Sequence, residues 1–142
     1  MVGDAAVTTD RDDAEILFTN ERFYAAFAGG DADEMARLWG EAGEVCCLHP
    51  GWEPLFGRNR VLASWQAILQ APPPVRCVAP RVVRMGPDGG AVICWEEIGG
   101  EYLIATNLFR REGDGWRVIH HQAGPVRGAP PDPESEPGRS VN

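Results

Sequence analysis

The chain has 142 residues, enough for one domain whose hydrophobic core needs neither a metal ion nor disulfides. Its 13 basic and 21 acidic side chains give a formal net charge of -8 without a basic stripe, which argues against nucleic-acid binding. Because the N-terminus does not resemble a signal peptide and no apolar run reaches membrane-spanning length, we expect a cytoplasmic protein with no membrane partner.

Three helices are predicted in the first half of the chain. Residues 1–10 are polar and expected to be flexible, and residues 12–28 then carry apolar side chains at helical spacing up to a Gly-Gly pair. Residues 31–39 begin with a pattern similar to a capping box and form a short second helix. Residues 58–70 have an apolar stripe and end at three prolines, which predicts a third helix.

Five strands are predicted from apolar runs between turn residues. Pro80 is expected at an edge or bulge position, because proline cannot donate a ladder hydrogen bond. The last two strands form a hairpin around the turn 112–115. The Pro-rich tail 128–142 is expected to be disordered. The strands are expected over 44–49, 75–85, 91–98, 102–110 and 116–122.

Helices followed by an antiparallel meander predict an α+β domain over residues 11–127. A curved sheet wrapped around the helices leaves a cavity at its open end. Its outer face would stay apolar unless another subunit covered it, so we expect a homodimer through that face. The four cysteines form no CxxC pair and are interpreted as reduced thiols: Cys46, Cys47, Cys77 and Cys94.

Three motifs strengthen this interpretation: NERFYAAF in the first helix, HPGW after the first strand, and GWRVIHHQAGP in the last strand. Together with the element order, they resemble the SnoaL-like branch of the nuclear transport factor 2-like superfamily over about residues 15–126. The last-strand motif is also similar to the association domain of calcium/calmodulin-dependent kinases. The resemblance implies a cystatin-like cone, in which a curved antiparallel sheet wraps around three N-terminal helices.

The resemblance also implies an interior pocket. Ketosteroid isomerases, polyketide cyclases and dehydratases use this pocket for catalysis, and other relatives use the fold only for transport or oligomerisation. Basic pocket residues of the kinase association domain align with Glu97, Asn107 and Ala123, so a preference for acidic ligands is not expected. The paired Tyr and Asp oxyanion hole of ketosteroid isomerases is not recognisable either.

Glu97 and Asn107 are the first candidate site residues, since both interrupt apolar strands. A carboxylate in an apolar pocket has a raised pKa and can serve as a general acid or base. The alternative for Glu97 is a rim glutamate in water or in an ion pair with an arginine.

His120 and His121 are candidate acid-base groups, and alternation sends only one of them inward. If the register follows the relatives, His121 faces the interior with Ala123. A bulge or a different loop length would instead send His120 and Gln122 inward, and both alternatives stay open. His49 lies at a strand end beside Trp52, near the expected pocket mouth, although it could also be an anchor for its loop.

Aromatic side chains suggest an apolar pocket for a cyclic or aromatic molecule. The residues assigned to ligand binding are His49, Trp52, Trp65, Phe27, Asn107, Phe109 and Gln122, and those assigned to catalysis are Glu97, His121 and His120. No metal or cofactor is expected, because neither HxH nor HExxH spacing is present and no phosphate loop or dinucleotide fingerprint occurs. The expected function is a cofactor-independent isomerase, cyclase or lyase. The alternative is a non-catalytic ligand-binding or dimerisation module.

Overall fold

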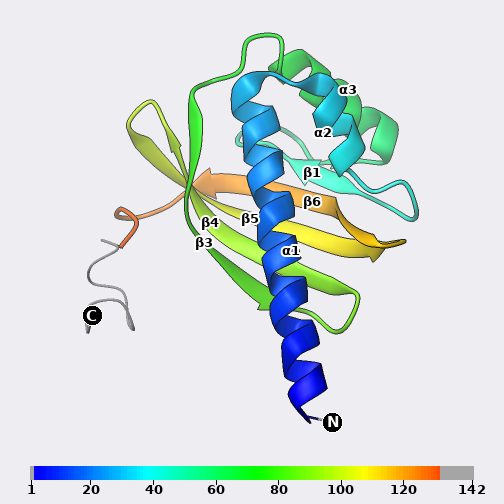
Figure 1. The fold of residues 1–142 in the computed structure, drawn as a ribbon. Helices are drawn as coiled ribbons and strands as arrows, with labels where there is room; N and C mark the ends of the chain where they lie inside the picture. The colour runs from blue at the N-terminus through cyan, green and yellow to red at the C-terminus, as the bar shows by residue number, and fades with distance from the viewer. Residues whose placement is uncertain (1, 132–142) are drawn as a thin grey trace.

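The computed structural model describes residues 2–131 and has three helices on one face of a six-stranded sheet (Figure 1). We call the face toward the helices the inner face and the opposite one the outer face. The elements are α1 (Val2–Gly29), α2 (Ala32–Leu38), β1 (Cys46–Leu48), β2 (Leu55–Phe56), α3 (Arg58–Ile68), β3 (Val75–Arg84), β4 (Gly89–Ile98), β5 (Glu101–Glu112) and β6 (Gly115–Pro125).

The strands lie in the order β2-β1-β6-β5-β4-β3, in a curved sheet whose two edge strands do not pair with each other. Strands β3 to β6 form the expected antiparallel meander. The sheet as a whole is mixed rather than antiparallel, because β1 runs parallel to β6. The short β2 was not predicted, since it consists of two residues inside a Pro- and Gly-containing loop.

The core lies between the inner face and α1, which crosses the sheet (Figure 1). Along α1 the residues that contact the sheet recur at i, i+3, i+4 and i+7, the spacing of one helical face. This stripe is formed by Asn20, Phe23, Tyr24 and Phe27, all of them buried.

Helix α2 begins where the capping pattern predicts. The Asp31 side chain accepts a hydrogen bond from the Glu34 backbone N–H at 3.0 Å, and acidic residues occupy the first turn. Helix α1 begins at Val2, earlier than the apolar spacing indicates. The flexibility of residues 1–10 stays a prediction, and most of the predicted tail lies outside the described residues.

Two bulges change the register of the sheet. In β3, pairing shifts between Val78 and Arg81, which confirms that Pro80 lies in a bulge of an edge strand. In β6, Val118 pairs with Phe109 and His120 pairs with Leu108, so one residue of β6 has no partner across the ladder. Within the part of the chain that the structure describes, no helix is long and apolar enough to cross a membrane.

Candidate functional site

The inner face carries a group of hydrogen-bonded polar side chains in the middle of the core. We call it the inner polar cluster, and its members come from α1, β4, β5 and β6: Asn20, Tyr24, Glu96, Asn107 and His121. All five are buried, and Glu96 and His121 are each only 1% exposed. Buried polar groups destabilise a fold unless they are paired, so their mutual geometry determines what the cluster can do.

One chain of hydrogen bonds connects the cluster. His121 Nδ1 lies 2.6 Å from Asn107 Oδ1. Asn107 Nδ2 donates to Asn20 Oδ1 at 2.9 Å and to the Tyr24 hydroxyl at 3.1 Å. The Tyr24 hydroxyl donates in turn to Glu96 Oε2 at 2.7 Å. Because Asn107 uses its amide N–H groups on Asn20 and Tyr24, its oxygen accepts from His121, and the imidazole proton resides on Nδ1.

Burial displaces the pKa values of the cluster in opposite directions. It raises the pKa of the Glu96 carboxyl, and the hydrogen bond from Tyr24 only partly opposes this shift. It lowers the pKa of His121 to about 3, and nearby His49 and His120 act in the same direction. His121 Nε2 lies 3.8 Å from Glu96 Oε2, but a neutral imidazole does not form an ion pair. The cluster therefore combines a free imidazole lone pair with a carboxyl group that holds its proton more tightly than usual.

His49 extends the polar region toward the surface. Its Nε2 lies 2.9 Å from Ser64 Oγ, and Ser64 Oγ donates to the Val61 carbonyl oxygen at 2.6 Å. The serine hydroxyl therefore accepts from His49 Nε2–H, which anchors the loop that follows β1. Burial lowers the pKa of His49 to about 4, and its ring centroid is 6.3 Å from that of His121.

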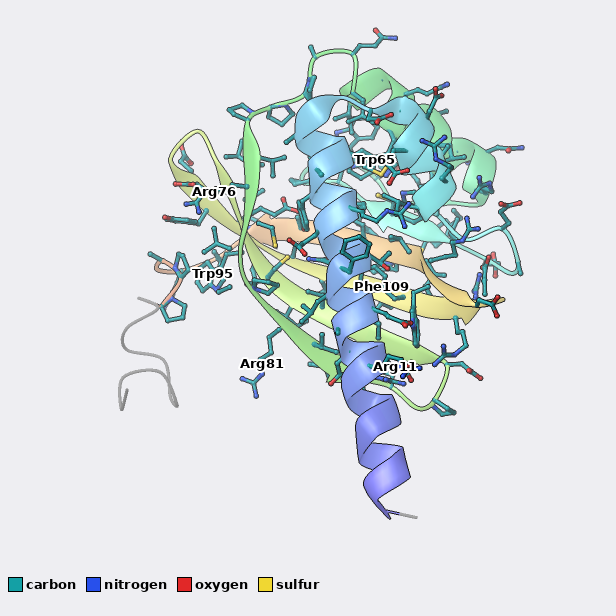
Figure 2. All side chains as sticks on the ribbon, viewed as in Figure 1. Arg11, Trp65, Arg76, Arg81, Trp95 and Phe109 are labelled. Atoms are coloured by element: carbon teal, nitrogen blue, oxygen red, sulfur yellow. The ribbon has the colours of Figure 1, made fainter. Side chains whose placement is uncertain are left out.

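Two tryptophans separate the cluster from solvent. Trp65 is buried between the helices and the sheet (Figure 2), with its ring centroid 4.8 Å from His49 and 5.7 Å from His121. Trp52 is 48% exposed and packs edge-on against His49, with ring centroids 4.8 Å apart. His49 thus lies between an exposed aromatic side chain and the buried imidazole.

Besides His49 and Trp52, the structure places five of the residues predicted from the sequence on the inner side of the sheet. His121 faces inward with Ala123, and Asn107 holds it. Phe27 and Trp65 pack edge to face, 4.9 Å apart, beside the cluster. Phe109 follows Asn107 by two residues on β5, so it points to the same inner face, and it is buried in the hydrophobic core.

Three predicted residues lie elsewhere. Glu97 is on the outer face, where Oε1 lies 2.7 Å from Arg76 Nη2, as in the ion-paired alternative for this residue. His120 is half-buried on the outer face, with Nδ1 3.0 Å from Cys46 Sγ, and Gln122 is exposed. In Figure 2, Arg76 projects from the left side of the sheet, away from α2 and α3.

Asn20, Tyr24 and Glu96 are the three cluster members to which the sequence interpretation gave no role in the site. Both faces of β4 are apolar, so alternation alone did not identify Glu96 as the inward glutamate. Asn20 and the hydroxyl of Tyr24 are polar groups on the helical stripe that also carries Phe23 and Phe27, and a polar group on such a stripe indicates a buried partner. Among the residues that the structure describes, no group of three or more His, Cys, Asp or Glu side chains is arranged to hold a metal ion.

Comparison with known proteins agrees with this architecture. A structure of a provisionally named dehydratase from Streptomyces avermitilis, of the nuclear transport factor 2-like family, is 31% identical and superposes with a TM-score of 0.76. The match covers 84% of this chain and 99% of that chain. A provisionally named calcium/calmodulin-dependent protein kinase type II association domain from Thiobacillus denitrificans is 33% identical, with a TM-score of 0.64, and the match covers 77% and 93% of the two chains.

A curated relative, the F-box protein SKIP8 of Arabidopsis thaliana, is 27% identical over 119 residues. The match covers 76% of this chain, which spans about half (48%) of that protein's length. The family model for the SnoaL-like domain matches residues 16–127 and so includes the whole inner polar cluster. The chain therefore belongs to the SnoaL-like family, within the nuclear transport factor 2-like proteins.

Proposed function

We propose that the inner polar cluster transfers protons on a small cyclic or aromatic molecule, in a dehydration, isomerisation or cyclisation that needs no cofactor. The observation that carries the proposal is the pair formed by His121 and Glu96, with Nε2 and Oε2 3.8 Å apart. Their pKa values are displaced in opposite directions, so the imidazole keeps its lone pair free at neutral pH and the carboxyl group holds its proton more tightly than usual. The name of the Streptomyces avermitilis relative favours dehydration among the three reactions.

The proposed step acts on a carbonyl compound with a hydroxyl group on its β carbon. His121 Nε2 takes the proton from the α carbon, the C–H electrons form a C=C bond, and the C–O bond breaks. The departing oxygen takes the proton of Glu96 and leaves as water. Return of the proton from His121 to Glu96 restores both groups. Asn107 keeps the Nδ1–H tautomer, so that Nε2 is the basic atom.

Substrate entry requires the loop between β1 and α3 to move. Gly51 and Gly57 lie in this loop with φ of 81° and 93°, in the left-handed region that glycine adopts readily. Outward rotation of Trp52 uncovers His49, which leads to His121. In this proposal Trp52 acts as a lid over the inner polar cluster.

Adjacent residues on opposite sheet faces provide matched controls for the test. A panel of cyclic β-hydroxy ketones is incubated with the protein in D2O, and NMR follows both the enone product and deuterium at the α carbon. We expect His121→Gln and Glu96→Gln to lower the rate by about 100-fold or more, and His120→Gln and Glu97→Gln to leave it unchanged. Equal losses in the inner and outer variants, or full activity in the inner variants, would refute the assignment.

A second candidate function is a non-catalytic dimerisation module. It is favoured by the close packing around the cluster, where Trp65 and His121 are each 1% exposed. It is also favoured by the outer face, where four apolar side chains are only partly covered: Ile93, Trp95, Ile104 and Leu108. The partner in this proposal is a second copy of the chain, with the two outer faces in contact.

Sedimentation analysis distinguishes the two candidates. Dimerisation predicts a mass of twice the 15.5 kDa chain and a monomer for Trp95→Arg. Phe18→Arg, on the helical side of the molecule, is expected to remain a dimer. A dimer without turnover on any panel compound favours the module, whereas a monomeric wild type excludes it.

A further inference from the structure

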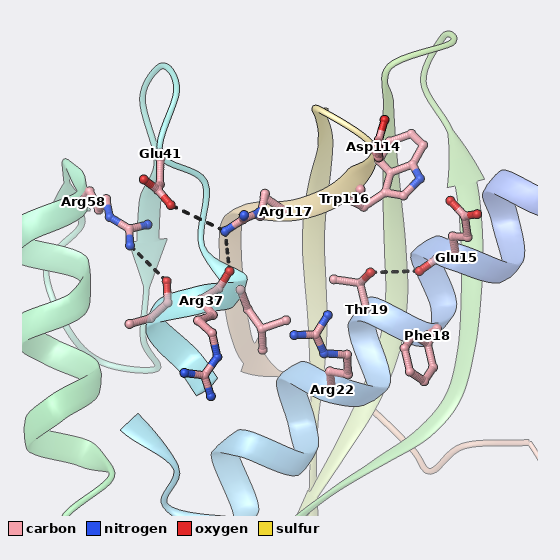
Figure 3. Close-up of a pocket in the computed structure, with 13 residues that line it drawn as sticks. Glu15, Phe18, Thr19, Arg22, Arg37, Glu41, Arg58, Asp114, Trp116 and Arg117 are labelled. Carbon is pink, nitrogen blue, oxygen red and sulfur yellow. Dashed lines mark hydrogen bonds and ion pairs between the residues drawn. The ribbon is translucent and has the colours of Figure 1, made fainter. Parts of the chain in front are cut away.

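A hollow of about 570 Å³ lies between α1, α2 and the turn that joins β5 to β6 (Figure 3). It shares no lining residue with the inner polar cluster. Its α1 wall is a second stripe of that helix, again with i, i+3, i+4 and i+7 spacing. This stripe consists of Glu15, Phe18, Thr19 and Arg22.

One end of the hollow is rich in arginine. Arg22 Nε and Nη2 both lie 2.8 Å from Glu34 Oε2, and Arg37 Nε lies 3.1 Å from Glu34 Oε1. Arg117 donates to the Arg37 carbonyl oxygen and lies 3.8 Å from Glu41 Oε2. Three guanidinium groups thus face two carboxylates, which leaves a net positive charge. Since each guanidinium has five N–H donors, several donors remain for a ligand.

The lining also includes Arg58, but its guanidinium is already engaged. It donates to the carbonyl oxygens of Ala36, Trp39 and Gly40 at 2.7–3.0 Å and so caps the end of α2. Arg58 therefore has a structural role, and the other three arginines are the ones available to bind a ligand.

The other end of the hollow is acidic. Glu15 on α1 and Asp114 in the β5–β6 turn lie there, on the side away from Arg37 (Figure 3). Neither forms an ion pair with any residue that the structure describes. Both walls therefore run from an acid to an arginine in the same direction, Glu15 to Arg22 on α1 and Asp114 to Arg117 on the hairpin.

Aromatic side chains occupy the middle of the hollow. Phe18 is 59% exposed, which is unusual for a phenylalanine on a helix that packs against a sheet. Trp116 is buried, and its Nε1–H has no hydrogen-bond partner among the described residues. The guanidinium of Arg111 stacks 4.4 Å from the Trp116 ring centroid and holds the indole in place. The centre thus offers an apolar surface, most of which belongs to the exposed ring of Phe18.

We propose that this hollow binds a short peptide of about three residues with free termini and an apolar central side chain. Glu15 and Arg22 are seven residues apart on a helix with a rise of 1.5 Å, so their Cα atoms are separated by about 10 Å along the axis. An extended peptide spans about 3.3–3.6 Å per residue, so three residues match this separation. The peptide carboxylate contacts Arg22, Arg37 and Arg117. Its ammonium group contacts Glu15 and Asp114, and its central side chain lies between Phe18 and Trp116.

Calorimetric titration of the full chain with Ala-Phe-Ala tests this assignment. Three further peptides are compared: the N-acetylated form, the C-amidated form, and the form with both ends blocked. We expect either single block to weaken binding about tenfold, since each removes the charge at one end of the peptide and with it the charge-assisted contacts there. No heat at millimolar Ala-Phe-Ala, or equal affinities for the free and doubly blocked peptides, would overturn the proposal.

Variants separate the two ends of the site. Glu15→Gln is expected to reduce the preference for the free peptide over the acetylated peptide only. Arg37→Gln is expected to reduce the preference for the free peptide over the amidated peptide only. Arg76→Gln is the matched control, because Arg76 and Arg37 have ion-paired side chains that are both 65% exposed. His121→Gln, in the inner polar cluster, is expected to bind all four peptides as wild type does. Identical peptide preferences in Glu15→Gln, Arg37→Gln and wild type would also overturn the proposal.

Discussion

Acid conditions should destabilise the protein through His121, because this imidazole takes up a proton from solvent at a much lower pH in the folded chain than in the unfolded chain. Burial lowers its pKa from 6.5 to about 3. Between these values the unfolded chain binds one proton more than the folded chain, so the free energy of unfolding decreases as the pH falls. From pH 7 to pH 5, one such group lowers it by about 2 kcal/mol. Below about pH 3 both states bind the proton, and this contribution no longer changes.

His121→Gln removes this proton while retaining an N–H donor for Asn107. We expect the loss of unfolding free energy between pH 7 and pH 5 to be about 2 kcal/mol smaller in the variant than in wild type. Glu96 is present in both proteins, so its opposite pH dependence largely cancels in the difference. Urea unfolding followed by tryptophan fluorescence measures this difference, with His120→Gln as the outer-face control. Identical pH dependence in wild type and His121→Gln would show that His121 takes up its proton at the same pH in the folded and unfolded chains, and would refute the lowered pKa.

Two further predictions concern the framework around the site. Ser64→Ala removes the acceptor of His49 Nε2–H inside the core. It should therefore lower the free energy of unfolding by about 1–3 kcal/mol, as measured by urea titration. A variant as stable as wild type would mean that His49 needs no hydrogen-bond partner. Gly30 has φ of 65°, and a Cβ there would lie 2.9 Å from the Leu69 carbonyl oxygen. Gly30→Ala should therefore lower the free energy of unfolding by about 1–2 kcal/mol and with it the thermal midpoint. Gly29→Ala is the control, because a Cβ there would have nothing within 4 Å, and it should leave the thermal midpoint unchanged.

The element types could be predicted from local patterns, but the place of β1 in the sheet could not. Apolar spacing, capping residues and glycine pairs act over a few residues, and they identified all three helices and the meander. The parallel pairing of Cys46 with His120 joins residues that are 74 positions apart. Nothing local in the short strand β1 specifies its neighbour or its direction, because this pairing depends on the packing of the whole domain.

The register of the sheet shows that Glu97 and Asn107 cannot both point inward, as the sequence interpretation had assumed. Gly99 and Gly100, both with positive φ, form a two-residue turn between β4 and β5. This turn pairs Glu97 with Tyr102 and places Asn107 opposite Val92. Paired residues point to the same face, and Tyr102 and Asn107 are an odd number of residues apart, so Glu97 and Asn107 face opposite sides. An inward Asn107 therefore requires Glu96 rather than Glu97.

The choice between the two adjacent histidines depends on one extra residue in β6. Trp116 and Val118 are buried against the helices, and simple alternation beyond them would send His120 inward. Ile119 lies in the bulge, between the residues that pair with Phe109 and Leu108, and it reverses the alternation so that His121 faces inward. The run Val118-Ile119-His120 has strong β propensity throughout and marks no bulge position. The inward histidine is held instead by a partner distant in the sequence, since His121 Nδ1 lies 2.6 Å from Asn107 Oδ1 in the inner polar cluster.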